Sequence, residues 1–340
     1  MIIRASVIQD HTTARPEPLD ESLRPAELRK QGERFKWDCL APQIELAEQA
    51  IAAGTDLLVF REDCNGVGNL TLPRMDRPDL LDMMSESIPD GMTTSCLADL
   101  ARKGSCYVVG CFNEKLDGRI YNTALLLDPH GKAVGKYHKT HLPPVEKLLT
   151  TPGNSLPVFE TEIGKIGMLV CYDMMTPEVA RCLALKGAEL LVWPSLGYGW
   201  WDEAGTFTVQ SRAHDNQVCL VGALPTHSCI VNAYGDLLVS AGLEPLTVIR
   251  AEIDPQQEPL QDQLHTNTYL TQTPSLRERH LFERRPELYD ALVDPHPERM
   301  DAYPNTNMHQ LDDDPQAAFE HYRAAWGKLH WQTRSDRLTH

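Results

Sequence analysis

The chain has 340 residues, of which 42% are hydrophobic and 24% charged, a composition typical of a globular protein with a sizeable core. Its 32 Lys and Arg residues stand against 48 Asp and Glu residues, which gives a formal charge of −16. Such an acidic protein repels phosphate backbones, so nucleic acid is excluded as an expected partner.

The nine cysteines are an odd number, and no two of them have CxxC spacing. A disulfide framework or a zinc knuckle is therefore disfavoured, and scattered unpaired thiols fit a reducing cytosol. The N-terminal residues lack the pattern of a signal peptide, and no segment approaches the apolar length of a membrane span. We expect a cytoplasmic protein without a membrane partner.

Strand and helix patterns alternate along most of the chain. A polar, proline-bearing segment at 10–32 is interpreted as an insertion loop. Strands are expected at 2–9, 56–60, 105–113, 165–171, 189–193 and 218–224, helices at 35–53, 93–103, 178–186 and 207–216, and hairpins at 120–139 and 229–239. Hairpins among alternating strands and helices favour a layered α/β fold with mixed sheets. A weak similarity of two strand–helix–strand blocks suggests an internal repeat.

The pattern changes from about Asp254, where Gln, Pro, His and Asp dominate. Two helices are expected beyond that point, at 276–293 and 316–330, and the second is rich in large aromatic residues. We therefore expect the chain to end in a tail. Residues 293–340 would form an extension that packs on the body of the protein or on a partner subunit.

Three chemically useful residues stand at the ends of predicted strands, where α/β proteins gather their active sites. Cys171 lies between an apolar strand and a helix start, and nearby backbone N–H groups would lower its thiol pKa and favour a nucleophilic thiolate. Glu62 could accept a proton, and Lys139 could stabilise an oxyanion. Taken singly, the three residues also fit a core thiol, a salt-bridged carboxylate and a solvated amine.

The segment 164–195 resembles the nucleophile region of the nitrilase, or carbon–nitrogen hydrolase, superfamily. Its matching positions are Cys171, Asp173, Pro177, Glu178, Arg181, Gly187, Ala188 and Pro194. Residues 135–153 resemble the lysine segment of that family, and residues 53–63 resemble its general-base strand. The three segments occur in the family's order, so the resemblance extends over most of the chain.

The resemblance implies a carbon–nitrogen hydrolase domain at 1–292 with a four-layer α-β-β-α sandwich of two mixed β-sheets. It implies that Cys171 attacks a carbonyl carbon and forms a thioester, with Glu62 as the base. Lys139 and the backbone N–H of Tyr172 would hold the oxyanion, and Glu146 would lie beside them. Neither a metal nor a cofactor is implied. Family members associate, so a homodimer or a higher homo-oligomer is expected.

The residues after the nucleophile narrow the expected substrate. Tyr172 and Asp173 resemble the amidase and carbamoylase branches, whereas nitrilases usually carry Trp-Glu. Met174 and Met175 stand where carbamoylases often have Arg, so we expect a small amide substrate and release of ammonia. The alternatives are an N-carbamoyl amidohydrolase, a nitrilase, an acyltransferase that passes the thioester to an amine, and a non-catalytic binding member.

Aromatic residues after the predicted strand 189–193 are candidates for a substrate-binding wall. Trp193, Tyr198 and Trp200 could line an apolar pocket, and they fit helix-start packing equally well. The chain also departs from the family pattern. Arg61 stands where the family usually has Pro, segment 10–32 is long, and residues 293–340 match no family element.

Overall fold

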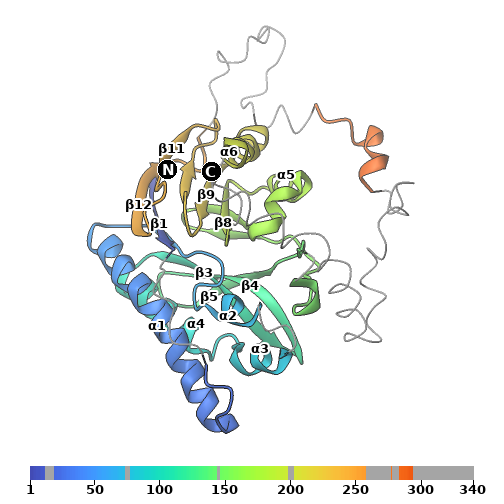
Figure 1. Ribbon diagram of the computed structural model, residues 1–340. Helices are drawn as coiled ribbons and strands as arrows, with labels where there is room; N and C mark the ends of the chain where they lie inside the picture. Colours follow the sequence, from blue (N-terminus) through green and yellow to red (C-terminus); the bar gives the residue numbers. More distant parts are fainter. Residues whose placement is uncertain are drawn as a thin grey trace, which may run out of the picture.

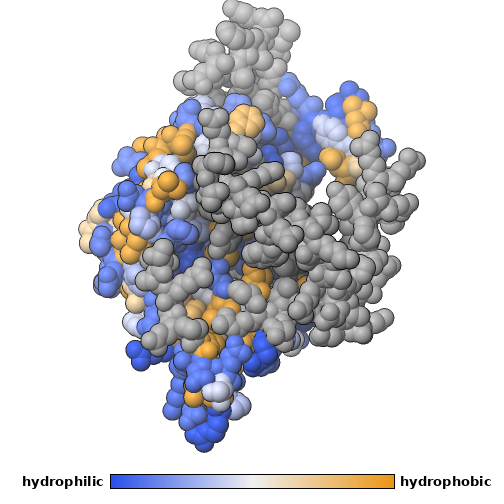
Figure 2. All heavy atoms as spheres, viewed as in Figure 1, coloured by the Kyte–Doolittle hydropathy of each residue, from blue (hydrophilic) through white to orange (hydrophobic). Residues whose placement is uncertain are grey.

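The computed structural model describes most of the chain up to residue 293. The described residues are 1–11, 19–72, 77–143, 146–197, 203–257, 277 and 283–293. The extension predicted at 293–340, with its helix at 316–330, lies outside the described residues except for Val293. No helix in the described ranges is long and apolar enough to cross a membrane. On the face shown in Figure 2, hydrophilic residues cover much of the described surface.

The first of two six-stranded sheets has the strand order β12-β1-β2-β3-β4-β5. Its strands are β1 (Ile3–Asp10), β2 (Leu57–Val59), β3 (Tyr107–Leu116), β4 (Arg119–Leu127), β5 (Ala133–His138) and β12 (Leu246–Ile253). Strands β1, β2 and β3 run parallel, and the other neighbours pair antiparallel. The sheet is therefore mixed.

The second sheet has the order β11-β10-β9-β8-β7-β6. Its strands are β6 (Val158–Thr161), β7 (Gly164–Met168), β8 (Leu190–Pro194), β9 (Cys219–Ala223), β10 (Cys229–Val231) and β11 (Leu237–Ser240). Here β7, β8 and β9 run parallel and the other neighbours antiparallel. The two sheets thus repeat one pattern, a parallel trio with one antiparallel strand on one side and two on the other, in agreement with the internal repeat suggested by the sequence.

Helices cover the outer face of each sheet, as Figure 1 shows. Helices α1 (Pro25–Ala52) and α4 (Met92–Gly104) pack on the first sheet, and α5 (Pro177–Leu185) and α6 (Glu203–Asn216) pack on the second. The shorter elements are α2 (Val67–Thr71), α3 (Pro78–Met84) and the 3-10 turns η2 (Glu146–Leu148), η3 (Cys171–Met175), η6 (Pro286–Leu288) and η7 (Asp290–Leu292). The expected four-layer α-β-β-α sandwich with two mixed sheets is confirmed.

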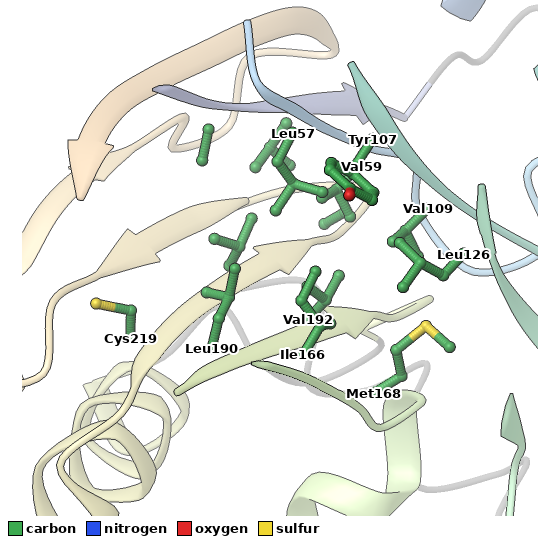
Figure 3. Packing of buried hydrophobic residues seen from close by; sticks show 14 of the residues in the cluster. Leu57, Val59, Tyr107, Val109, Leu126, Ile166, Met168, Leu190, Val192 and Cys219 are labelled. Atoms are coloured by element: carbon green, nitrogen blue, oxygen red, sulfur yellow. The ribbon is translucent and has the colours of Figure 1, made fainter. Parts of the chain in front are cut away.

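Buried side chains form a separate apolar layer between the two sheets. Figure 3 shows Leu57 and Val59 of β2 opposite Ile166 of β7 and Leu190 of β8. Leu58, between the two β2 residues in sequence, points to the helix-covered face instead. Because successive strand residues face opposite sides of a sheet, the short apolar strands fill both layers and must be hydrophobic throughout.

The insertion loop predicted at 10–32 is wrong in its second half, because α1 begins at Pro25 rather than near Phe35. Pro25 occupies the first turn of the helix, where its missing N–H is no loss. The N-terminal part of the helix carries many exposed charged residues and buries only a few residues, among them Leu28. That sparse apolar face resembles a polar loop in sequence.

The helix predicted at 276–293 is also not found at 283–293, although Arg277 is helical. Residues 283–293 hold the two single 3-10 turns η6 and η7, with no buried residue in either. The sequence patterns also missed α2, α3, β6 and β12. Strand β12 pairs with β1 over its whole length and closes the edge of the first sheet.

We expect Leu190→Ala to lower the free energy of unfolding by about 2–5 kcal/mol, because it leaves a cavity between the sheets. The matched control is Leu243→Ala, whose parent side chain is 74% exposed. That change should stay within about 0.5 kcal/mol of the parent protein. Urea denaturation followed by tryptophan fluorescence measures both. Equal effects of the two substitutions would contradict a tightly packed inter-sheet layer.

Candidate active site

A sharp turn after β7 presents the thiol of Cys171. The strand ends at Met168, and Cys171 opens the 3-10 turn η3 with a φ of 45°. This left-handed conformation is uncommon for a residue with a side chain, and it concentrates at functional sites. Its thiol is half-buried. The turn therefore holds the side chain at the carboxyl end of the strand, as the sequence predicted.

The side chain of Trp193 forms a hydrogen bond to this turn. Its indole Nε1–H donates to the backbone carbonyl of Cys171 at 3.2 Å. The side chain itself is fully buried in the apolar layer between the second sheet and its helices. Trp193 was predicted to contact substrate, but this burial leaves it no free surface, so it acts as a support. The other predicted wall residues, Tyr198 and Trp200, lie outside the described residues.

Glu62 follows β2 and its side chain is 3% exposed. Three donors surround its carboxylate: Asn122 Nδ2 at 2.8 Å and Lys139 Nζ at 2.9 Å on Oε1, and the backbone N–H of Leu196 at 2.7 Å on Oε2. The last of these comes from the loop after β8, in the other sheet. Both sheets therefore fix the position of the Glu62 carboxylate.

Arg61, at the position where the resemblance leads one to expect proline, stabilises the loop that follows β2. Its guanidinium Nη1 donates to the carbonyl oxygens of Glu62 at 2.8 Å and Asp63 at 3.0 Å. The side chain is buried, and Nη2 lies 3.6 Å from Oδ2 of Asp10. Arg61 thus holds the backbone at Glu62 and Asp63 through their carbonyl oxygens.

Lys139 follows β5, and its ammonium lies between two carboxylates. Nζ is 2.9 Å from Oε1 of Glu62 and 2.6 Å from Oε2 of Glu146, and the side chain is 1% exposed. Burial lowers the pKa of Lys139, but the charges of Glu62, Cys171 and Glu146 raise it by a larger amount. The pKa of Lys139 therefore lies well above its ordinary value. Lys139 is therefore a fixed positive charge at neutral pH.

Asn122 on β4 links the two carboxylates, and the sequence patterns missed it. Its Nδ2 donates to Glu62 at 2.8 Å and to Glu146 at 2.6 Å, and its Oδ1 accepts the thiol hydrogen of Cys111 at 3.2 Å. Burial raises the pKa of Glu146. Asn122 lies two residues before the core residue Ala124 on the same strand and so faces the same side of the sheet. A polar side chain at such a position could have indicated the site from the sequence, because buried amides need hydrogen-bond partners.

The expected depression of the thiol pKa is wrong. Burial, reinforced by the negative charges of Glu62 and Glu146, raises the pKa of Cys171 to about 12, although Lys139 acts in the opposite direction. Because these three charges reach the thiol, the residues predicted from separate segments share one site. At neutral pH the thiol is protonated, so a base must remove its proton before it can attack.

The backbone N–H of Tyr172 points to no acceptor within the described part of the chain. Its side chain is 42% exposed. An unpaired amide next to a half-buried thiol can donate to an oxygen atom that arrives at that thiol. The geometry therefore combines a thiol, a buried carboxylate, a fixed ammonium and a free amide donor.

Proteins of known type are similar to this chain in sequence. A model of the carbon–nitrogen hydrolase family matches residues 33–258. The chain is 32% identical over 268 residues to the omega-amidase NIT2-B of Xenopus laevis, an alignment that covers 69% of this chain and 92% of the relative.

Solved structures share the fold. Nit3 of Saccharomyces cerevisiae, a member of branch 10 of the nitrilase superfamily, superposes with a TM-score of 0.60 at 26% identity and covers 75% of this chain and 90% of its own. An amidase from Nesterenkonia sp. gives a TM-score of 0.60 at 22% identity over 85% and 96% of the two chains, a likeness in fold. The family match over 33–258, the omega-amidase relative and the shared sandwich agree, and the chain belongs to the carbon–nitrogen hydrolase family of the nitrilase superfamily.

Proposed function

We propose that this enzyme hydrolyses the carbon–nitrogen bond of a small amide, with Cys171 as nucleophile, and releases ammonia. The observation that carries the proposal is the hydrogen-bonded cluster of Glu62, Lys139 and Glu146, whose charges act on the half-buried thiol of Cys171. The relative named omega-amidase supports an amide as the substrate class. So does the pair Tyr172-Asp173 after the nucleophile, which resembles the amidase branch.

Bond formation begins with a proton transfer. Glu62 takes the proton of the Cys171 thiol, and the sulfur attacks the carbonyl carbon of the amide as the carbonyl π electrons move to oxygen. Lys139 and the backbone N–H of Tyr172 hold the resulting oxyanion. Because Lys139 is charged throughout, its contribution grows as negative charge develops on that oxygen.

Collapse of the oxyanion breaks the carbon–nitrogen bond. Glu62 returns its proton to the departing nitrogen, so that ammonia leaves and a thioester remains on Cys171. Water then attacks the thioester carbon while Glu62 accepts a proton from it. The carbon–sulfur bond breaks, the carboxylic acid leaves, and the sulfur regains a proton. Glu146 and Asn122 keep Lys139 and Glu62 in place throughout.

We expect Cys171→Ala to lower ammonia release from short primary amides by at least about 10³-fold, because an alanine side chain cannot form the thioester. The measurement is a coupled ammonia assay on a panel of short amides, N-carbamoyl amino acids and nitriles, with amides as the preferred class. Cys96→Ala, a half-buried thiol on α4, is the matched control and should retain activity. Undiminished turnover by Cys171→Ala would refute the proposal.

Glu62→Gln should lower turnover and, at the same time, lower the pKa of the Cys171 thiol. We expect kcat to fall by about 10²- to 10⁴-fold, because the base is lost. The same change removes a negative charge that raises the pKa of Cys171, so the thiol should ionise at lower pH than in the parent enzyme, whose thiol pKa is about 12. Iodoacetamide labelling of the Cys171 peptide, followed by mass spectrometry against pH, measures that ionisation.

In the parent enzyme, labelling should rise with pH throughout the alkaline range, because the thiolate fraction grows about tenfold per pH unit below the pKa. In Glu62→Gln the rise should begin and level off earlier. A labelling curve that stays in place, or moves to higher pH, would show that Glu62 does not act on the thiol.

A further inference from the structure

Asp173 lies two residues after Cys171, and its carboxylate is fully buried. The backbone N–H of Val170, immediately before Cys171, donates to its Oδ2 at 2.8 Å. The backbone N–H of Asp173 itself donates to the carbonyl of Val170 at 3.0 Å. The carboxylate therefore spans the turn from inside and fixes the backbone on both sides of the nucleophile.

The same carboxylate also binds the segment that carries Lys139. The Tyr137 hydroxyl donates to Oδ2 at 2.8 Å, and the Thr140 hydroxyl and the backbone N–H of His141 donate to Oδ1 at 3.1 and 2.9 Å. The ring nitrogen Nδ1 of His141 lies 3.0 Å from Oδ1. These donors stand on both sides of Lys139 in sequence, at the end of β5.

We propose that Asp173 is a positioning residue that sets the distance between the thiol of Cys171 and the ammonium of Lys139. The two segments belong to different sheets, and Asp173 joins them through hydrogen bonds to one buried group. This inference rests on the proposed function, because it concerns the geometry of that reaction. The sequence match of Asp173 to the family motif gave no role for it.

The chemistry of the site calls for a carboxylate rather than an amide. Two oxygens with several lone pairs can accept from Val170, Tyr137, Thr140 and His141 at once. An asparagine offers one acceptor oxygen, and its NH₂ group would face a donor on the other side. Either the Cys171 side or the Lys139 side would then lose its hydrogen bonds.

A second buried carboxylate provides the matched control. Glu114 on β3 accepts hydrogen bonds from Thr123 and Lys136, and its Oε2 lies 2.8 Å from His138 Nε2. All of these partners belong to the first sheet, so Glu114 does not join the two segments of the site. Glu114→Gln therefore removes a comparable buried charge without touching the Cys171 turn.

We expect Asp173→Asn to lower kcat for the best amide by at least about 10²-fold, because a displacement of about 1 Å between reacting groups has that effect. KM should change little, and Cys171 labelling should lose its parent pH profile. Glu114→Gln should change stability as much as Asp173→Asn but should leave kcat close to the parent value. Unfolding midpoints and kinetics are measured on the full chain for both variants.

Tyr137→Phe tests the same link if Asp173→Asn fails to fold. It removes one donor to Asp173 and keeps the buried ring in the inter-sheet layer. We expect kcat to fall at unchanged KM. If Asp173→Asn folds, the combined variant should lose less activity than the product of the two single losses.

An equal kcat for Asp173→Asn and Glu114→Gln, or an unaltered kcat for Tyr137→Phe, would overturn the positioning role. Neither result would bear on Cys171 as the nucleophile. That separate claim fails only if Cys171→Ala remains active, so the two failures are distinguishable.

Discussion

The ammonium of Lys139, buried between Glu62 and Glu146, is the interaction on which the site depends. Removing one partner of a buried ion pair leaves an uncompensated charge, which typically costs about 3–5 kcal/mol. Here one cation holds two carboxylates near a thiol whose pKa is raised, so that the thiol is protonated before the reaction begins. In the proposed reaction, negative charge moves from Glu62 to sulfur and then to the oxyanion, so no charge is added to the buried cluster at any step.

The repeated sheet pattern explains how residues far apart in sequence reach this cluster. Glu62 follows β2 and Lys139 follows β5 in the first sheet, whereas Cys171 follows β7 in the second. Strand ends of the two sheets meet face to face, and contacts such as Leu196 N–H to Glu62 join them. The apolar layer between the sheets therefore also positions the strand ends that carry Glu62, Lys139 and Cys171.

The sequence predicted the layered fold and the segments that carry Glu62, Lys139 and Cys171, because strand ends and apolar runs are local patterns. It could not predict the pKa of the thiol, since that depends on burial and on charges from other segments. Asn122 was missed for the same reason. The start of helix α1 was predicted too far along the chain, because its first turns carry many charged residues and only a narrow apolar stripe. The domain limit at residue 292, self-association and a cytoplasmic location stay predictions.

The proposed thioester is tested most directly by its partition between water and hydroxylamine. Two substrates with the same acyl group, a primary amide and the corresponding ester, are turned over at fixed hydroxylamine concentration, and hydroxamate and acid are quantified. If both pass through one acyl-enzyme on Cys171, the ratio of hydroxamate to acid is identical for the two leaving groups. A ratio that changes with the leaving group would contradict a shared covalent intermediate.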